Sequence, residues 1–272
     1  MIVLLSVEHV SKTFKRGGLF STRRIEAVKD VSFKMGAGRP EIFTVIGESG
    51  SGKSTLARMI LGIHRPTSGR LLLEGADIAQ ASNRAARHAF MARVQPIFQN
   101  PFEAFNPLKR LDHYLFLTAR RFGGATTPAQ EEEQADRALR QVGLSLAEAK
   151  ERFPHELSGG QLQRIAIARA LISRPRLIVA DEPVSMVDAS LRMAIVNQFR
   201  ALRDELGISI IYITHDLATA YYISDRLIIM QKGEVVEAGD ARTVLAAPKH
   251  PYSRQLRDAV LLPDAAGADP VR

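Results

Sequence analysis

The chain has 272 residues, of which 46% are hydrophobic and 24% are charged, a balance typical of one large or two small globular domains. It contains no cysteine, which excludes a disulfide framework, thiolate metal sites and iron–sulfur clusters and fits a reducing compartment. The 37 basic and 29 acidic side chains give a net charge of +8, which favours anionic partners such as nucleotides, nucleic acid or an acidic membrane surface; a solvated, arginine-rich surface explains this charge equally well.

The apolar N-terminus, residues 1–5, is interrupted by Ser6 and is too short for the core of a signal peptide. No stretch approaches the roughly 20 apolar residues that a membrane-spanning helix needs. We therefore expect that the chain does not cross a bilayer by itself and that residues 2–10 form a first strand.

A second strand is predicted at residues 26–35, joined to the first by a basic loop at 15–24. Val28 is out of phase with the alternating apolar residues that follow it, which indicates either a bulge near Asp30 or a late strand start. Phe14 lies just after the first strand. A flat aromatic side chain near a nucleotide site can stack on the base, and a side chain that covers the sheet is an equally good interpretation.

The central motif of the chain follows an apolar run at 41–46, which is predicted as a buried strand. The segment reads Gly47-Glu48-Ser49-Gly50-Ser51-Gly52-Lys53-Ser54-Thr55 and matches the phosphate-binding pattern GxxxxGK[ST], the P-loop. Residues 53–61 are predicted as a helix that ends at Gly62, so backbone N–H groups and a helix start form one anion site. We expect Lys53 to reach the β- and γ-phosphates and the Ser54 hydroxyl to bind Mg²⁺. A Gly/Ser-rich surface turn is the alternative.

The next elements alternate between strands and helices. Strands are predicted at 70–75 and at 93–98, where Pro96 indicates an edge position or a bulge, and a helix is predicted at 81–91. Residues 101–155 then have only helical patterns, including capping boxes that begin at Thr127 and Ser145. This segment is predicted to be a helical insertion between two strand-bearing parts.

The remaining elements restore the alternation of strands and helices. Their predicted ranges are a helix at 162–172, a strand at 177–180, a helix at 191–206, a strand at 208–213, a helix at 218–223 and a hairpin of strands at 226–230 and 234–238. The short apolar strands are typical of a buried parallel sheet. Helices and a frayed tail at 264–272 are expected to finish the chain.

Polar side chains follow four of the predicted strands, and in open α/β sheets ligands bind at the carboxyl ends of the strands. Asp181 ends one strand, where a carboxylate can hold Mg²⁺ directly or through water. Glu182 is predicted to polarise a water for attack on the γ-phosphate as a general base. His215 is predicted to contact the γ-phosphate, and Gln99 to contact Mg²⁺ or the attacking water. An isolated Asp-Glu pair more often ends a strand in solvent, but the upstream P-loop favours the functional interpretation.

A second glycine-rich segment, Ser158-Gly159-Gly160-Gln161, precedes the helix predicted at 162–172. A hydroxyl, two glycines and a helix N-terminus form another anion-binding design. An ordinary serine cap with a glycine hinge is the alternative. Because one nucleotide does not need two such cradles from a single chain, we predict head-to-tail pairing, in which this segment of one chain closes on the nucleotide held by the P-loop of another.

Taken in order, these motifs resemble the ATP-binding subunit of an ABC transporter, over about residues 1–255. The motifs that carry the resemblance are residues 47–55, Gln99, residues 157–161, residues 177–182, Ser185-Met186-Val187-Asp188 and His215. The segment at 185–188 is usually Ser-Ala-Leu-Asp in the family. Here it is Ser-Met-Val-Asp, a mild departure that keeps the serine and the aspartate. The resemblance implies an α/β fold: a P-loop NTPase, RecA-like core with an antiparallel β subdomain and an inserted helical subdomain.

The resemblance also implies domain limits and residue roles. Residues 1–255 would form a single ATPase domain, with the core and β subdomain at 1–100 and 157–240, the helical subdomain at 101–156, and a short C-terminal extension at 241–272. The implied roles are adenine stacking by Phe14; phosphate and Mg²⁺ binding by Gly47, Ser49, Gly50, Ser51, Gly52, Lys53, Ser54 and Thr55; Mg²⁺ sensing and coupling to membrane subunits by Gln99; closure on the partner's ATP by Ser158, Gly159, Gly160 and Gln161; catalysis by Glu182; dimer bridging by Asp188; and γ-phosphate contact by His215.

A narrower resemblance is to the oligopeptide, dipeptide and nickel branch of importers. It is carried by Phe98-Gln99-Asn100-Pro101-Phe102, Asn106-Pro107 and His250-Pro251-Tyr252. Many longer members of that branch carry a C-terminal cysteine cluster, which is absent here. The resemblance implies an ATPase motor for peptides or a related small solute, peripheral on the cytoplasmic face of the cell membrane, with ATP and Mg²⁺ as cofactors. Implied partners are a second ATP-binding subunit, identical or homologous, integral membrane permease subunits and, indirectly, a solute-binding receptor. The solute itself is not encoded here.

The main alternative is an ABC-type ATPase that acts on nucleic acid or ribosomes, which the net charge would suit. DNA-repair members of the superfamily interrupt the core with long coiled coils, and ribosome-associated members carry two cassettes in each chain. Here about 100 residues separate Lys53 from Ser158 without sustained heptads, and there is one cassette. Nucleic acid is therefore not expected as a partner. A simple P-loop kinase would leave the segment at 158–161 without a role.

Overall fold

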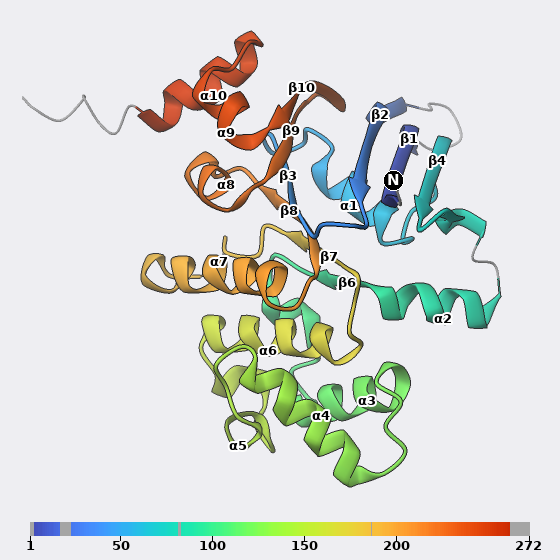
Figure 1. The fold of residues 1–272 in the computed structure, drawn as a ribbon, viewed down its shortest axis with the longest axis vertical. Coiled ribbons are helices and arrows are strands. Elements are labelled where there is room, and N and C mark those ends of the chain that lie inside the picture. Colours follow the sequence, from blue (N-terminus) through green and yellow to red (C-terminus); the bar gives the residue numbers. More distant parts are fainter. Residues whose placement is uncertain (1–2, 17–22, 81–82, 186, 262–272) are drawn as a thin grey trace, which may run out of the picture.

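The computed structural model describes residues 3–16, 23–80, 83–185 and 187–261. They form a four-stranded antiparallel sheet, a six-stranded mostly parallel sheet and a set of helices (Figure 1). In Figure 1 the antiparallel sheet lies at one side of the larger sheet, and the helices of the predicted insertion form the opposite end of the molecule. No helix in the described ranges is long and apolar enough to cross a membrane.

The two sheets draw strands from distant parts of the chain. The smaller sheet has the order β2-β1-β4-β5 and the larger one the order β10-β9-β3-β8-β7-β6. The strands are β1 (Val3–Arg16), β2 (Arg23–Gly36), β3 (Ile42–Ile46), β4 (Ser68–Leu73), β5 (Ala76–Asp77), β6 (Val94–Ile97), β7 (Leu177–Asp181), β8 (Ser209–Thr214), β9 (Arg226–Gln231) and β10 (Glu234–Asp240). In the larger sheet only the β9–β10 pair is antiparallel.

The helices confirm the predicted alternation, with bounds that differ by one to three residues at most ends. They are α1 (Lys53–Ile60), α2 (Arg84–Arg93), α3 (Leu111–Phe122), α4 (Pro128–Arg140), α5 (Leu146–Ala149), α6 (Gly159–Ile172), α7 (Ala189–Asp204), α8 (Leu217–Ile223), α9 (Ala241–Ala246) and α10 (Pro251–Leu261), with 3₁₀ turns η1 (Ile78–Gln80), η2 (Pro101–Ala104) and η3 (Pro154–Glu156). Part of the helix predicted from residue 81 and the predicted tail at 264–272 lie outside the described residues.

Strands β1 and β2 are longer than predicted, so the prediction of a loop at 15–24 is wrong at both ends. The two strands stay paired as far as Lys15 with Arg24 and Arg16 with Arg23. The residues at these strand ends are polar and are held in the sheet by cross-strand hydrogen bonds. They lack the alternation of apolar side chains by which a strand is predicted from sequence, so the prediction ended too early. The predicted bulge is confirmed: Lys12 pairs with Val28 and Val10 with Val31, and Asp30 between them has a positive φ of 48°.

Apolar side chains cover both faces of the six-stranded sheet, as a parallel sheet requires. On β7, Leu177 and Val179 pack in one cluster with α1, whereas Ile178 and Ala180 pack in another with α6 and α7. Alternate residues of β7 therefore pack against helices on opposite faces of the sheet. Helices α1 and α6 consequently lie on different sides of the sheet. Strand β6, which contains Pro96, is at the edge, as predicted.

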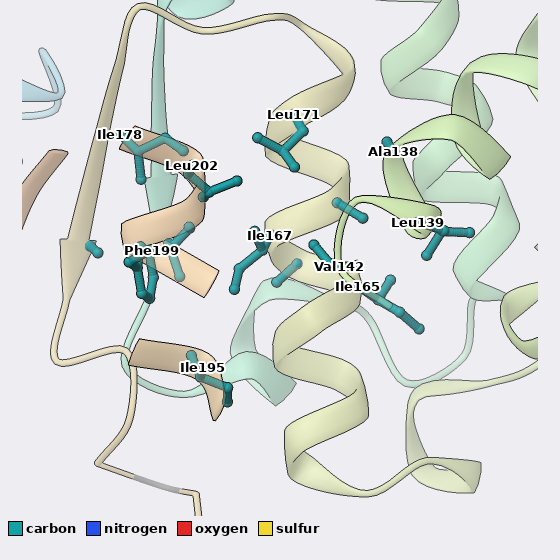
Figure 2. Packing of buried hydrophobic residues seen from close by; sticks show 14 of the residues in the cluster. Ala138, Leu139, Val142, Ile165, Ile167, Leu171, Ile178, Ile195, Phe199 and Leu202 are labelled. Atoms are coloured by element: carbon teal, nitrogen blue, oxygen red, sulfur yellow. The ribbon is translucent and has the colours of Figure 1, made fainter. Parts of the chain in front are cut away.

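Helix α6 joins the helical part to the sheet. Figure 2 shows Ile165 of α6 near Leu139 of α4, whereas Ile167 and Leu171 of α6 lie on the side of the helix toward Phe199 of α7. All five side chains belong to one cluster of buried residues. Helix α6 is buried on almost all sides. It therefore forms a rigid connection between the glycine-rich segment at its N-terminus, residues 158–161, and the sheet. Thr127 caps α4 as predicted, with its hydroxyl accepting from the Gln130 N–H at 3.3 Å.

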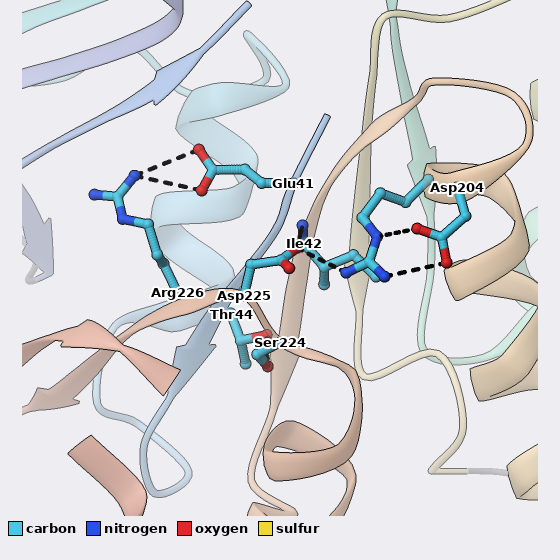
Figure 3. Close-up of polar contacts among 8 residues, drawn as sticks. Glu41, Ile42, Thr44, Asp204, Ser224, Asp225 and Arg226 are labelled. Carbon is cyan, nitrogen blue, oxygen red and sulfur yellow. Dashed lines mark hydrogen bonds and ion pairs between the residues drawn. The ribbon is translucent and has the colours of Figure 1, made fainter. Parts of the chain in front are cut away.

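Asp225, just before β9, ties three elements together at the amino end of the parallel strands (Figure 3). Its carboxylate accepts from the Ile42 backbone N–H and from the Arg203 guanidinium, both at 2.8 Å. Arg203 is also paired with Asp204, and Arg226 with Glu41. This network anchors β3, and with it the chain that leads into the P-loop.

We expect Asp225→Ala to lower the free energy of unfolding by about 1–3 kcal/mol, because it leaves the Ile42 N–H and one side of Arg203 without their acceptor. Urea unfolding followed by circular dichroism measures this. Asp258→Ala is the matched control, since Asp258 is exposed and, among the described residues, pairs with its neighbour Arg257. Equal stability of the two variants would contradict the anchoring role.

Candidate nucleotide site

The P-loop joins β3 to α1 and is held by groups from distant parts of the chain. The ammonium of Lys53 donates to the carbonyls of Gly47 at 2.6 Å and Glu48 at 2.8 Å. The Ser51 N–H donates to the Glu48 carbonyl at 3.2 Å, and the Ser51 carbonyl accepts from the Gly233 N–H at 3.0 Å. These contacts close the loop around the lysine and tie it to the turn after β9.

Gly52, the last glycine of the loop, is required by both space and backbone conformation. It has a φ of 106°, and a Cβ atom there would lie 2.2 Å from the Ala27 carbonyl oxygen of β2. Strand β2 of the antiparallel sheet therefore packs directly on the loop. This close approach is a tertiary reason for a residue that the sequence motif already demands.

Burial disfavours the charged forms of two side chains at the site, Lys53 of the loop and Asp181 of β7. Burial lowers the pKa of Lys53, an effect that the carboxylates of Glu182 and Asp181 oppose. Burial raises the pKa of Asp181, opposed by the Ser54 hydroxyl, which donates to it at 3.3 Å. A cation beside Asp181 and phosphate oxygens beside Lys53 would favour the charged form of each.

The oxygen donors fit Mg²⁺. Ser54 and Asp181 supply a hydroxyl and a carboxylate, the hard ligands that Mg²⁺ prefers, and Mg²⁺ commonly takes its other ligands from water and substrate phosphates. The described residues hold no group of three or more His, Asp or Glu side chains that could hold a metal ion. The Ser51 hydroxyl is buried in the loop without a hydrogen-bond partner among the described residues.

The predicted catalytic side chains come together from three strand ends. One carboxylate oxygen of Glu182 lies 3.3 Å from His215 Nδ1, and the other lies 3.3 Å from Gln99 Nε2. Glu182 has a positive φ of 47°, and its N–H donates to the Ile213 carbonyl at 2.9 Å. The backbone thus turns at Glu182, and its half-buried carboxylate lies at the carboxyl end of β7, beside Asp181. This places a candidate base within reach of the loop that would hold the γ-phosphate.

The second glycine-rich segment forms the start of α6. Ser158 and Gln161 form a capping box with one another: the Ser158 hydroxyl accepts from the Gln161 backbone N–H at 3.2 Å, and the side-chain Oε1 of Gln161 accepts from the Ser158 N–H at 3.1 Å. A Cβ at Gly160 would lie 2.8 Å from Leu191 of α7, so this glycine allows α6 and α7 to pack closely. Asp188, the N-cap of α7, is exposed.

Phe14 lies on β1, opposite Ile25 of β2. Its ring packs edge-on against His64, which follows the far end of α1, at a centroid distance of 5.6 Å. The ammonium of Lys12 lies 5.1 Å from the centroid of the same ring. The side chain is half-buried, so both interpretations from the sequence stay open and its stacking on adenine stays a prediction.

One contact of the loop was missed by the sequence motifs. The backbone N–H of Glu48 donates to the hydroxyl of Tyr252, at the start of α10, at 2.9 Å. The two residues are 204 positions apart. The only sequence signal was the segment His250-Pro251-Tyr252, which was noted solely for its resemblance to a family branch.

A phosphate loop on a parallel sheet, together with two consecutive carboxylates, Asp181 and Glu182, at the end of β7 in the same sheet, defines a P-loop ATPase. The ABC transporter family model matches residues 28–185 of the chain. A probable peptide ABC transporter ATP-binding protein of Sinorhizobium fredii is 42% identical over 97% of this chain and 74% of its own length. The oligopeptide transport ATP-binding protein OppF of Haemophilus influenzae is 40% identical over 96% of this chain and 79% of its own.

Solved structures agree with these relatives. The dimeric, post-hydrolysis structure of the ATP-binding cassette MJ0796 bound to ADP and Pi has a TM-score of 0.76 and 28% identity, and covers 88% of this chain and 99% of that one. The structure of cbiO1 from Clostridium perfringens has a TM-score of 0.75 and 26% identity, and covers 90% and 92% of the two chains.

The chain belongs to the ABC transporter family. The predicted resemblance, the α/β P-loop NTPase fold and the assignment as an ATPase of a transporter that uses ATP are thereby confirmed. The comparisons give no support to the nucleic-acid alternative.

Proposed function

We propose that this chain is the ATP-hydrolysing motor subunit of an importer for peptides or a related small solute, bound peripherally to membrane subunits on the cytoplasmic face of the cell membrane. The observation that carries the proposal is the convergence of Glu182, His215 and Gln99 beside a complete P-loop. The importer class and the peptide cargo rest on the names of relatives, which include a peptide ABC transporter protein and an oligopeptide transport protein.

Within this function the residues divide into three roles. The P-loop residues Gly47 to Thr55 bind the phosphates, and Ser54, Asp181 and Gln99 hold or sense Mg²⁺, which would neutralise developing phosphate charge when bound. Glu182 accepts a proton from the attacking water, and His215 orients the carboxylate and the γ-phosphate. The chain acts as one ATPase domain over residues 1–255, with residues 101–156 as a helical subdomain and 241–272 as a C-terminal extension.

Head-to-tail dimerisation completes the site. Because α1 and α6 cover opposite faces of the six-stranded sheet, the exposed Ser158 at the start of α6 is suited to a nucleotide outside its own chain. Residues 158–161 would then close on the ATP of a second ATP-binding subunit, and the exposed Asp188 would lie at the same interface. ATP can drive closure because it binds the closed dimer better than the open one. The dimeric cassette among the structural neighbours is consistent with this arrangement.

The test is reconstitution of this chain with candidate permease subunits and a candidate solute receptor of a peptide importer from the same organism. We expect the chain to co-purify with the permeases and, in vesicles, to hydrolyse ATP several-fold faster when receptor and peptide are both present. A receptor without peptide is the control. Retention on nucleic acid at physiological salt, with no co-purification of permeases, would contradict the proposal.

A further inference from the structure

The C-terminal helix α10 reaches back to the P-loop through one buried side chain. Tyr252 is only 3% exposed and belongs to the same apolar cluster as Ile46, the residue directly before the loop. Its hydroxyl accepts the hydrogen bond from the Glu48 N–H at 2.9 Å. Burial raises the pKa of Tyr252, so the hydroxyl is protonated at neutral pH.

The tyrosine is held in place by the turn that precedes α10. The carboxylate of Glu237, on β10, accepts from the backbone N–H groups of Lys249 at 2.8 Å and His250 at 3.1 Å. The ring nitrogen Nδ1 of His250 accepts from the Tyr252 N–H at 3.2 Å. The segment is thus fixed to the sheet independently of the P-loop, which makes it a rigid support for the hydroxyl.

The hydrogen bond acts on one particular peptide group. The Glu48 N–H and the Gly47 carbonyl belong to the same peptide unit, and that carbonyl accepts from the Lys53 ammonium at 2.6 Å. Bonds at the two ends of one peptide polarise it and strengthen each other. The unit begins at a glycine, whose backbone rotates at little steric cost, so the peptide needs an outside contact to keep its carbonyl directed at the lysine.

We propose that Tyr252 is a positioning residue of the ATP site: its hydroxyl orients the Gly47–Glu48 peptide, and that peptide in turn sets the position of the Lys53 ammonium for the phosphates. The inference rests on the proposed phosphate-binding role of Lys53. It gives the C-terminal extension, which carries no ATP-site motif of its own, a direct part in nucleotide affinity.

The first test is Tyr252→Phe, which keeps the ring and its packing and removes only the hydroxyl. We expect the Kd for Mg·ATP, measured by calorimetry on the full chain, to rise about 2- to 10-fold, the range of one net hydrogen bond. The rate at saturating ATP should stay near the wild-type value, since Glu182 and His215 are untouched. Tyr221→Phe is the matched control, because Tyr221 lies on α8 with 52% exposure. An unchanged Kd in Tyr252→Phe would overturn the inference.

A double-mutant cycle with Lys53→Ala separates positioning from general loosening of the fold. If Tyr252 acts through the lysine, Tyr252→Phe should have no further effect on the Kd once Lys53 is gone. An equal fold-change in both backgrounds would show a merely structural role and overturn the inference. Thermal unfolding of each variant confirms that it is folded. Failure of the wild-type chain to bind ATP would instead overturn the proposed function, so the two failures are distinguishable.

Discussion

Replacing Glu182 by Gln is expected to slow ATP hydrolysis by about 10²–10⁴-fold, the usual contribution of a general base, while ATP binding stays intact. The amide is nearly isosteric with the carboxylate, so it can keep contacts at the positions of Gln99 and His215, 3.3 Å away. It can also occupy the same positive-φ backbone, which is held by the Ile213 carbonyl. What the variant loses is the group that accepts a proton from water.

Because hydrolysis would no longer open the closed state, Glu182→Gln should accumulate an ATP-bound dimer, visible as a larger species in gel filtration with Mg·ATP and absent with Mg·ADP. Single-turnover hydrolysis measures the rate. Glu205→Gln, the same change at an exposed position after α7, is the control and should behave as wild type. Turnover of Glu182→Gln at the wild-type rate would remove Glu182 from the role of base.

Lys53→Ala is expected to have the opposite signature and to weaken ATP binding itself, by about 10- to 100-fold, as expected for loss of a hydrogen bond to a charged group. The ammonium is buried beneath the loop, and burial lowers its pKa, so it is held there at an electrostatic cost that phosphate oxygens would offset. The fold should tolerate the change, because removing a buried charge removes that cost.

Equilibrium binding of Mg·ATP measures this effect, and thermal unfolding shows whether the variant is folded. Lys150→Ala is the matched control, since Lys150 is exposed and paired with Glu132 at the surface of the helical part. An affinity for ATP within twofold of wild type would contradict the assignment of Lys53 to the phosphates. Together, Glu182→Gln and Lys53→Ala separate the chemical step from the binding step.

Local sequence patterns were informative where the same few consecutive residues set both the backbone conformation and the reactive groups. The P-loop requires glycines for its backbone and a lysine for its charge within nine positions, so its place between β3 and α1 followed directly. The same holds for Asp181 and Glu182 at the end of an apolar strand. The carboxyl-end rule for parallel strands predicted that the polar groups after four strands lie at one nucleotide site, and the structure places Gln99 and His215 each 3.3 Å from Glu182.

Patterns failed where pairing between distant segments decided the outcome. The ends of β1 and β2 carry polar residues that only cross-strand hydrogen bonding makes regular. Phe14 lies within β1, and its ring rests against His64 and Lys12. The contact with His64 is not predictable from the alternation of apolar residues, because it depends on how the segment after α1 packs on the antiparallel sheet; Lys12 is two residues from Phe14 on the same strand.

By itself, the sequence determined the class of protein: the order and spacing of its phosphate loop, glycine-rich segment and strand-end carboxylates are local properties. Only the tertiary structure decided what surrounds them. It placed the starts of α1 and α6 on opposite faces of one sheet, and it set Tyr252 against Glu48 across 204 positions of chain. The physical reason is that a hydrogen bond between distant residues depends on the packing of every element between them, which no short motif encodes.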